Sequence, residues 1–137
     1  EISHVKELEK GRGISYGLKY VTPGMRKIAT IPIGYADGFT RMLSGKAEVL
    51  VKGKKVPVVG RICMDQCLID VTGIDVKIGD EVVLFGSDGI NTITTDEVAE
   101  KLGTINYEIT CMISKRIPRE YTRAGKTVKT VDYLMNL

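Results

Sequence analysis

Apolar and polar residues alternate in short runs along this chain, and glycine-containing turns separate most of the runs. A spacing of two places every second side chain on one face of a strand, so the pattern predicts β-structure. The runs that we expect to form strands are 2–8, 13–21, 27–34, 48–52, 55–60, 66–71 and 81–85, with 128–134 as a weak strand or a tail.

Two of these runs carry further information. In the second run, Ile14, Tyr16 and Leu18 share one face at a spacing of two. The run 27–34 is apolar on both faces and predicts an interior strand, but Pro32 has no N–H to donate and favours an edge or a bulge. The runs 48–52 and 55–60 flank Gly53-Lys54, which predicts a β-hairpin.

One helix is well marked by its ends. Thr94 can cap it, and Glu97 stands three residues further on, where it would complete a capping box. Ile93 can pack against Val98 as a hydrophobic staple, and Gly103 can end the helix. Residues 106–113, which follow it, fit a helix or a strand equally well.

Short strands at regular spacing, interrupted by glycine turns, are typical of a mainly β protein. We therefore expect a barrel-like or Greek-key β domain with one or two short helices. The pattern contains no internal repeat and no linker, so residues 1–137 are expected to form one domain. The chain begins at Glu1 rather than Met, inside a strand-like run, and we expect it to be a piece of a longer protein.

Composition excludes several classes of function. The net charge is only +3 and no dense block of Lys or Arg occurs, so a nucleic-acid role is not indicated. No run reaches the length of a membrane span, and no signal peptide opens the chain, so we expect no membrane contact from this segment. Cys63, Cys67 and Cys111 match no zinc or redox spacing and suggest reduced thiols in the cytoplasm. His4 is the only histidine, and no metal site is predicted.

Four stretches are richer in Gly, Tyr, Arg and Asp than packing requires. They are Gly-Ile-Ser-Tyr-Gly at 13–17, Ile-Gly-Tyr-Ala-Asp-Gly at 33–38, Gly-Arg-Ile-Cys-Met-Asp at 60–65, and Ile-Asn-Tyr-Glu-Ile at 105–109. A tyrosine in a β domain is more often a core residue than a catalytic one, and each stretch alone is a weak signal. A guanidinium nearby favours the phenolate, however, and so allows a tyrosine to act as a general base. Arg12, Arg41 and Arg61 stand near these tyrosines in the sequence.

Taken together, the four stretches and the Arg-Ile-Pro-Arg-Glu-Tyr run at 116–121 resemble the carboxy-terminal β domain of alanine racemase. That family comprises pyridoxal-phosphate enzymes that interconvert L- and D-alanine for bacterial cell-wall (peptidoglycan) synthesis. The resemblance covers nearly the whole chain. It implies that residues 1–137 are the carboxy-terminal domain alone, without the amino-terminal α/β barrel, because the chain shows no β/α alternation.

The resemblance implies a role for individual residues. Tyr16 matches the catalytic tyrosine, Met64 the residue whose backbone contacts the substrate carboxylate, and Tyr107 the tyrosine at the cofactor phosphate. The positions that match the substrate channel are Tyr35, Arg41, Arg61 and Asp65.

The resemblance also implies partners. In the family, the β domain of one subunit serves the cofactor of the other, so the active enzyme is a homodimer. The lysine that holds pyridoxal phosphate lies in the missing barrel, and we expect the isolated chain neither to hold the cofactor nor to racemise alanine.

Three alternatives stay open at this point. The same domain could come from a membrane-bound serine racemase of vancomycin (glycopeptide) resistance, whose parent would be membrane-anchored. The chain could instead be a non-catalytic β-barrel module that binds an anion through its tyrosines and arginines. It could also be a structural domain that uses its β surface to dimerise.

Overall fold

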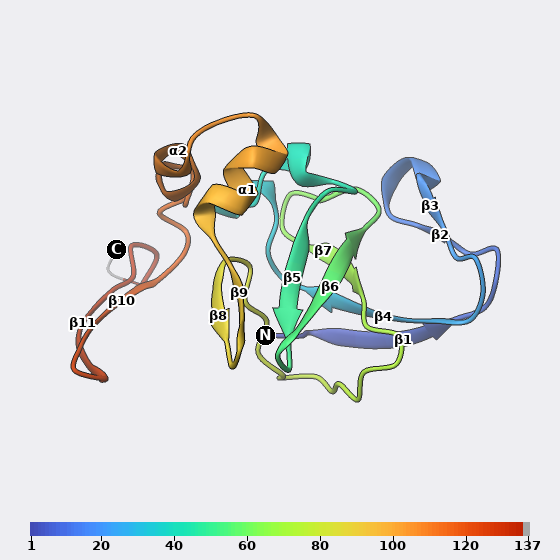
Figure 1. Ribbon diagram of the computed structural model, residues 1–137, viewed down its shortest axis with the longest axis horizontal. Coiled ribbons are helices and arrows are strands. Elements are labelled where there is room, and N and C mark those ends of the chain that lie inside the picture. The colour runs from blue at the N-terminus through green and yellow to red at the C-terminus, as the bar shows by residue number, and fades with distance from the viewer. Residues whose placement is uncertain (136–137) are drawn as a thin grey trace.

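The computed structural model describes residues 1–135, and its centre is one antiparallel sheet (Figure 1). The sheet has five strands in the order β1-β4-β7-β6-β5. Neighbouring strands run antiparallel throughout. In sheet order the strands are β1 (His4–Leu8), β4 (Arg26–Ile31), β7 (Cys67–Asp70), β6 (Lys54–Val59) and β5 (Glu48–Val51).

The segment 79–83 connects the two edges of this sheet. At one edge, just before β1, Ile2 N–H donates to Asp80 O at 2.9 Å, and Gly79 N–H donates to Ile2 O at 2.8 Å. At the other edge, the N–H groups of Leu50 and Val83 donate to each other's carbonyl at 2.8 and 2.9 Å. One segment thus bonds the residue before β1 and the middle of β5, and this link between the two sides of the sheet gives it a barrel-like form.

The core lies inside this sheet and under the helices. Side chains from neighbouring strands, including Ala29, Val49 and Ile69, are completely buried there. Helix α1 (Thr95–Leu102) adds Val98 and Ala99 to the same cluster, and helix α2 (Asn106–Cys111) adds Ile109. The mainly β fold with short helices is therefore confirmed.

Shorter elements surround the sheet. Strands β2 (Gly13–Ile14) and β3 (Tyr20–Val21) pair on either side of the 3-10 turn η1 (Tyr16–Leu18). The turns η2 (Tyr35–Asp37) and η3 (Arg41–Leu43) follow β4. Two further hairpins are β8 (Gly86–Asp88) with β9 (Asn91–Ile93), and β10 (Arg119–Arg123) with β11 (Lys126–Val131).

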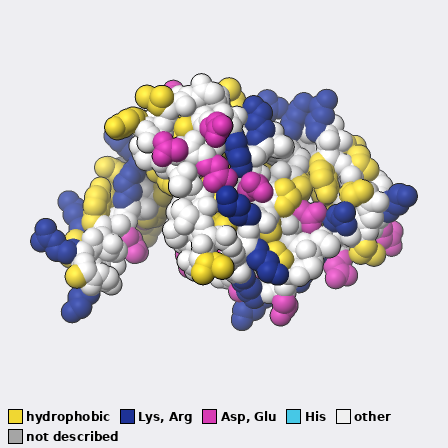
Figure 2. Space-filling view, viewed as in Figure 1, with side chains coloured by type: hydrophobic (Ala, Val, Ile, Leu, Met, Phe, Trp, Pro, Cys, Tyr) yellow, Lys and Arg dark blue, Asp and Glu magenta, His cyan; other side chains and the backbone are white. Residues whose placement is uncertain are grey.

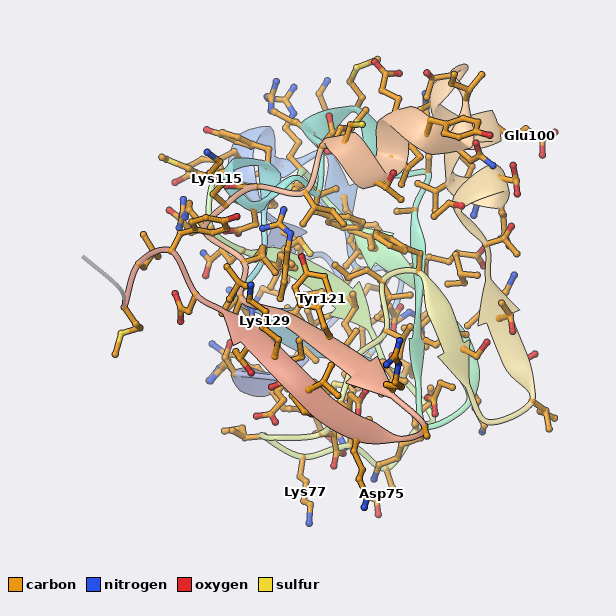
Figure 3. All side chains as sticks on the ribbon, turned by 90° about the vertical axis from the view of Figure 1, so that its left-hand side faces the viewer. Asp75, Lys77, Glu100, Lys115, Tyr121 and Lys129 are labelled. Atoms are coloured by element: carbon orange, nitrogen blue, oxygen red, sulfur yellow. The ribbon has the colours of Figure 1, made fainter. Side chains whose placement is uncertain are left out.

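The β10–β11 hairpin extends from the body of the molecule, at the left of Figure 1. Dark-blue Lys and Arg side chains gather on it in Figure 2. Tyr121 and Lys129 face each other in its register and lie on it in Figure 3. The expected weak strand at 128–134 corresponds to β11, which begins and ends slightly earlier in the chain.

The run 13–21 is not one strand, and that prediction is wrong. The strand pairing stops after Ile14 because Ser15 has φ 63° and ψ −179°, and Gly17 has φ 71°. These positive φ values turn the chain back on itself. Ile14 is buried, whereas Tyr16 and Leu18 are exposed, so the three residues do not share a face.

Two other strand predictions differ from the structure. Residues 81–85 form no strand, and only Val83 bridges to Leu50. Strand β4 lies in the interior of the sheet between β1 and β7, and Pro32 comes just after its last residue, so neither an edge nor a bulge is needed there. The 48–60 hairpin is confirmed, although its turn is Lys52-Gly53, with φ 48° and 72°, rather than Gly53-Lys54.

The predicted helix is confirmed with one difference at its start. Glu97 N–H donates to Thr94 Oγ1 at 3.0 Å, and Gly103 ends the helix with φ 74°. The Glu97 carboxylate accepts from Lys55 Nζ at 3.0 Å instead of reaching back to Thr94, so only half of the capping box forms. Residues 106–113, which fitted either type of element, begin as helix α2. No helix within residues 1–135 has the length and apolar character needed to cross a membrane.

Candidate active site

A cleft of about 800 Å³ opens between three of the four stretches that the sequence singled out. The stretch around Tyr16 forms one side, the turn at Tyr35 another, and the segment after Gly60 the floor. The residues that line it are Tyr16, Tyr35, Arg41, Ile62, Cys63, Met64, Asp65 and Gln66.

Tyr16 projects from a strained turn. Its side chain is 73% exposed, so it is not a core residue. The backbone of Ser15 occupies a region of φ and ψ that is almost exclusive to glycine, which costs about 1–3 kcal/mol and persists only where surroundings impose it. The Ser15 hydroxyl donates to Arg61 O at 2.6 Å, and this bond ties the turn to the cleft floor.

Gly34 brings the Tyr35 turn into direct contact with the floor. Tyr35 N–H donates to Cys63 O, and Ala36 N–H donates to Met64 O, each at 3.0 Å. A Cβ on Gly34 would lie 2.2 Å from Cys63 O, closer than any real contact. Only glycine permits this approach, which explains the Ile-Gly-Tyr pattern.

The backbone of Met64 has an unpaired hydrogen-bond donor beside the cleft. Its carbonyl accepts from Ala36, but within residues 1–135 no acceptor is found for its own N–H. Met64 is 53% exposed and lines the cleft. An unpaired backbone N–H at an open surface can donate a hydrogen bond to a carboxylate oxygen.

Two of the predicted channel residues bring opposite charges to the cleft. Arg41 comes from η3, and the side chain of Asp65 is 58% exposed beside Met64. Arg61, in contrast, is not among the residues that line the cleft. Its guanidinium packs against Gly17, and Arg61 lines a smaller cavity of about 260 Å³.

Tyr107 lies apart from the cleft lining. It stands on α2 with 75% of its side chain exposed, and neighbouring Ile105 is also exposed. The structure therefore brings Tyr16, Tyr35, Arg41, Met64 and Asp65 together and leaves Tyr107 and Arg61 outside that group.

Electrostatics distinguish the two cysteines near the cleft. Burial, and then the nearby Cys63, raise the pKa of the Cys67 thiol to about 12. Cys63 is partly exposed and lines the cleft. No cluster of metal-ligating side chains is present among the described residues, and no lysine of residues 1–135 lines the cleft.

Sequence reasoning did not single out four residues that matter here. Cys63 and Gln66 line the cleft, Ser15 fixes the Tyr16 turn, and Arg116 bonds Asp65 with Nη2 to Oδ1 at 2.6 Å. Ser15, Cys63 and Arg116 lay inside the runs named above, but only the folded chain indicates which members of a run line the cleft or support it.

These features define a β domain that contributes an exposed tyrosine, a free N–H and one side chain of each charge to a site open on one side. A family model described as "Alanine racemase, C-terminal domain" matches residues 1–121, and the chain belongs to this family. The expectation drawn from the four stretches is confirmed at this level. The assignment of residues 122–137 to the same domain stays a prediction.

Named relatives agree with the family model. The chain is 52% identical over 135 residues to the alanine racemase of Clostridium novyi. The aligned region covers 97% of this chain and 35% of the relative. It is 58% identical over 121 residues to that of Halothermothrix orenii, covering 88% of this chain and 32% of the relative.

Solved structures show the same relation. The crystal structure of alanine racemase from Bacillus anthracis with bound L-Ala-P superposes with a TM-score of 0.95 at 48% identity, over 99% of this chain and 35% of that chain. Alanine racemase from Clostridium difficile in complex with cycloserine superposes with a TM-score of 0.88 at 52% identity. The match covers 97% of this chain and 35% of that chain. The chain thus spans about a third of the length of these relatives.

Proposed function

We propose that this chain supplies one half of the active site of an alanine racemase that interconverts L- and D-alanine. The observation that carries the proposal is the position of Tyr16, which projects from a strained turn over a cleft with the free N–H of Met64 on its floor. Membership of the family supports it.

In this proposal Tyr16 exchanges the proton at the α-carbon of alanine. Racemisation requires a proton to leave one face of that carbon and another to arrive at the opposite face, so a base is needed on each side. The Tyr16 hydroxyl serves one face. The Met64 N–H holds the carboxylate, and Tyr35, Arg41 and Asp65 line the path to solvent.

Pyridoxal phosphate, when bound, supplies the electron sink that makes the α-proton removable. The exposed side chains here fit part of such a site. The Tyr107 hydroxyl is free for a phosphate oxygen, because no bond to it is found within residues 1–135. The cleft lining includes Tyr16 but, among described residues, no lysine to bind the cofactor covalently. We therefore place that lysine, with the base for the opposite face, in the parent's other domain.

We further propose that the partner is a second racemase subunit, and that the homodimer acts in the cytoplasm to provide D-alanine for peptidoglycan. Exposed Tyr16, Met64 and Tyr107 are consistent with groups that meet another surface. The isolated chain is expected to show no racemase activity and no visible absorbance of bound cofactor after mixing and desalting.

The other candidate functions have less support. The relatives reported above are alanine racemases and lend no support to a serine racemase. An anion-binding module would favour a positive cleft, but Asp65 offsets Arg41 among the lining residues.

The test is Tyr16→Phe in the parent racemase. Loss of an acid–base group should lower kcat/KM by about 10²–10⁴-fold. The Tyr16 hydroxyl bonds no residue in the described part of this domain, so its loss should leave the fold and thermal stability of the domain unchanged. Tyr20→Phe is the matched control: the Tyr20 hydroxyl bonds Asp70 at 3.4 Å away from the cleft lining, and activity should be retained. Full activity in Tyr16→Phe would refute the proposal.

A further inference from the structure

Arg116 joins two walls of the cleft from outside its lining. Its Nη2 lies 2.6 Å from Asp65 Oδ1, and its Nε lies 3.4 Å from Asp37 Oδ1. Asp37 belongs to the η2 turn that carries Tyr35, and Asp65 follows Met64 on the floor. One guanidinium therefore contacts both segments.

The contact on the Asp37 side is anchored by the backbone. The Asp37 side chain is only 7% exposed, and its Oδ2 accepts from Gly34 N–H at 2.9 Å. Ser114 N–H donates to Asp37 O at 3.0 Å, so the segment that carries Arg116 is held against η2 by main chain as well. This end of the contact is buried and fixed.

The contact on the Asp65 side is exposed and depends on Arg116. Within residues 1–135, the Asp65 carboxylate has no other hydrogen-bond or ion-pair partner. The bond to Asp65 and, after it, the charge of Asp37 raise the pKa of Arg116, so the guanidinium stays charged at any working pH. Exposed ion pairs add little stability. Their geometry can nevertheless fix the position of a loop.

We infer that Arg116 is a positioning residue for the racemase site. Main-chain bonds from Tyr35 and Ala36 already hold the η2 turn on the floor. Arg116 adds the link that fixes the Asp65 side chain against buried Asp37, and thereby steadies the adjoining Met64 N–H that meets the substrate carboxylate. This inference rests on the proposed function. Arg116 is not a catalytic residue, because it does not line the cleft. A planar guanidinium can hold two carboxylates in fixed directions, whereas a lysine ammonium cannot.

The experiment uses the parent racemase with Arg116→Gln, Arg116→Lys and the control Arg123→Gln. Arg123 lies exposed on β10, so the control removes the same charge from the same region. For Arg116→Gln we expect KM for alanine to rise about ten-fold, inside the range of up to about 100-fold that misplacing a group by an ångström costs. We expect kcat to change much less. Arg116→Lys should fall between the wild type and Arg116→Gln, and Arg123→Gln should match the wild type.

A second measurement does not depend on activity. Hydrogen exchange should become faster in peptides that cover residues 60–68 in Arg116→Gln, and stay unchanged in Arg123→Gln.

Unchanged KM in Arg116→Gln, or unchanged exchange at 60–68, would overturn the inference. A lower melting temperature together with unchanged KM and unchanged exchange would indicate a purely structural role. If Tyr16→Phe abolishes activity while Arg116→Gln leaves KM unchanged, the positioning role fails and the racemase function stands. If Tyr16→Phe is fully active, the proposed function itself fails.

Discussion

Cys63 and Cys67 differ in chemistry although they stand four positions apart. Cys67 lies in β7, faces the core and is 1% exposed, whereas Cys63 lines the cleft. Burial removes the solvation that a thiolate needs, so the pKa of Cys67 rises to about 12. A thiol that stays protonated is a poor nucleophile.

Alkylation at neutral pH should therefore modify Cys63 and exposed Cys111 but spare Cys67. Mass spectrometry after a short treatment of the native protein with iodoacetamide measures this directly. All three cysteines should react once the protein is denatured. Labelling of Cys67 as fast as Cys111 in the native protein would contradict the burial of Cys67.

The same shift predicts a dependence of stability on pH. Above its ordinary pKa of 9.0 the unfolded thiol loses its proton, while the folded thiol keeps it up to about 12. Above pH 9.0 the unfolded state therefore binds fewer protons than the folded state. The contribution of Cys67 to the free energy of unfolding is complete below pH 9.0 and is lost as the pH rises towards 12. Denaturation curves of the wild type and Cys67→Ala across that pH range should show a smaller loss of unfolding free energy in the variant.

Tyr16 shows how far residue types alone can lead. The Gly-Ile-Ser-Tyr-Gly stretch pointed to this tyrosine, but the period of two placed it on a strand face with buried Ile14. The difference arises at Ser15, whose positive φ is rare for a residue with a Cβ. A bond from its hydroxyl to Arg61 O, 46 positions away, holds it there, and no local pattern contains that bond.

Between elements, glycines control how closely the turns approach the cleft floor. A Cβ on Gly38 would lie 2.3 Å from Met112 O, just as one on Gly34 would meet Cys63 O. The η2 turn is therefore held between the floor and the end of α2, without room for a side chain at either flanking glycine. The second stretch reads Gly-Tyr-Ala-Asp-Gly for this steric reason.

Gly34→Ala should destabilise the protein and disturb the cleft. Relief of the contact with Cys63 O requires the backbone to move, and overpacking of this kind costs about 1–3 kcal/mol or more. Gly24→Ala is the matched control, because a Cβ there meets nothing within 4 Å. Chemical denaturation of both variants checks the difference. Equal stability of the two would mean that η2 does not press on the floor.

Elements with local signals were predictable and those with distant partners were not. Helix α1 has its cap, its stop and its buried residues within one stretch of sequence, and it forms as expected. Residues 81–85 are apolar enough for a strand, but the chain uses 79–83 to satisfy Ile2 and Leu50 at the two sheet edges. That use depends on how the sheet curves, which periodicity does not encode.

At the scale of the molecule, the candidate site is open on the side where Tyr16, Tyr35 and Met64 are exposed. The family was evident from the sequence because several motifs occur together, whereas the positions of Tyr107 and Arg61 outside the cleft lining required the structure. Under the proposed function, the lysine that binds the cofactor comes from another surface, because no described lining residue of the cleft is a lysine. The proposed homodimer supplies that surface from the partner subunit.

Hybrid dimers test whether the domain serves its neighbour. One parent carries Tyr16→Phe, and the other carries a substitution of the cofactor lysine in its barrel; each homodimer should be nearly inactive. If Tyr16 acts on the partner's cofactor, a hybrid has one site with both lesions and one intact site. Random exchange of equal amounts then makes half of the dimers hybrids and restores about a quarter of the wild-type sites.

The stoichiometry distinguishes the two arrangements. If Tyr16 served the barrel of its own subunit, each site of a hybrid would carry one lesion, and mixing would restore nothing. Activity is measured before and after subunit exchange. Subunit exchange between two batches of the Tyr16→Phe parent is the control, and it should stay inactive because every site in it lacks the hydroxyl. Recovery in the hybrids alone assigns the tyrosine to one subunit and the lysine to the other.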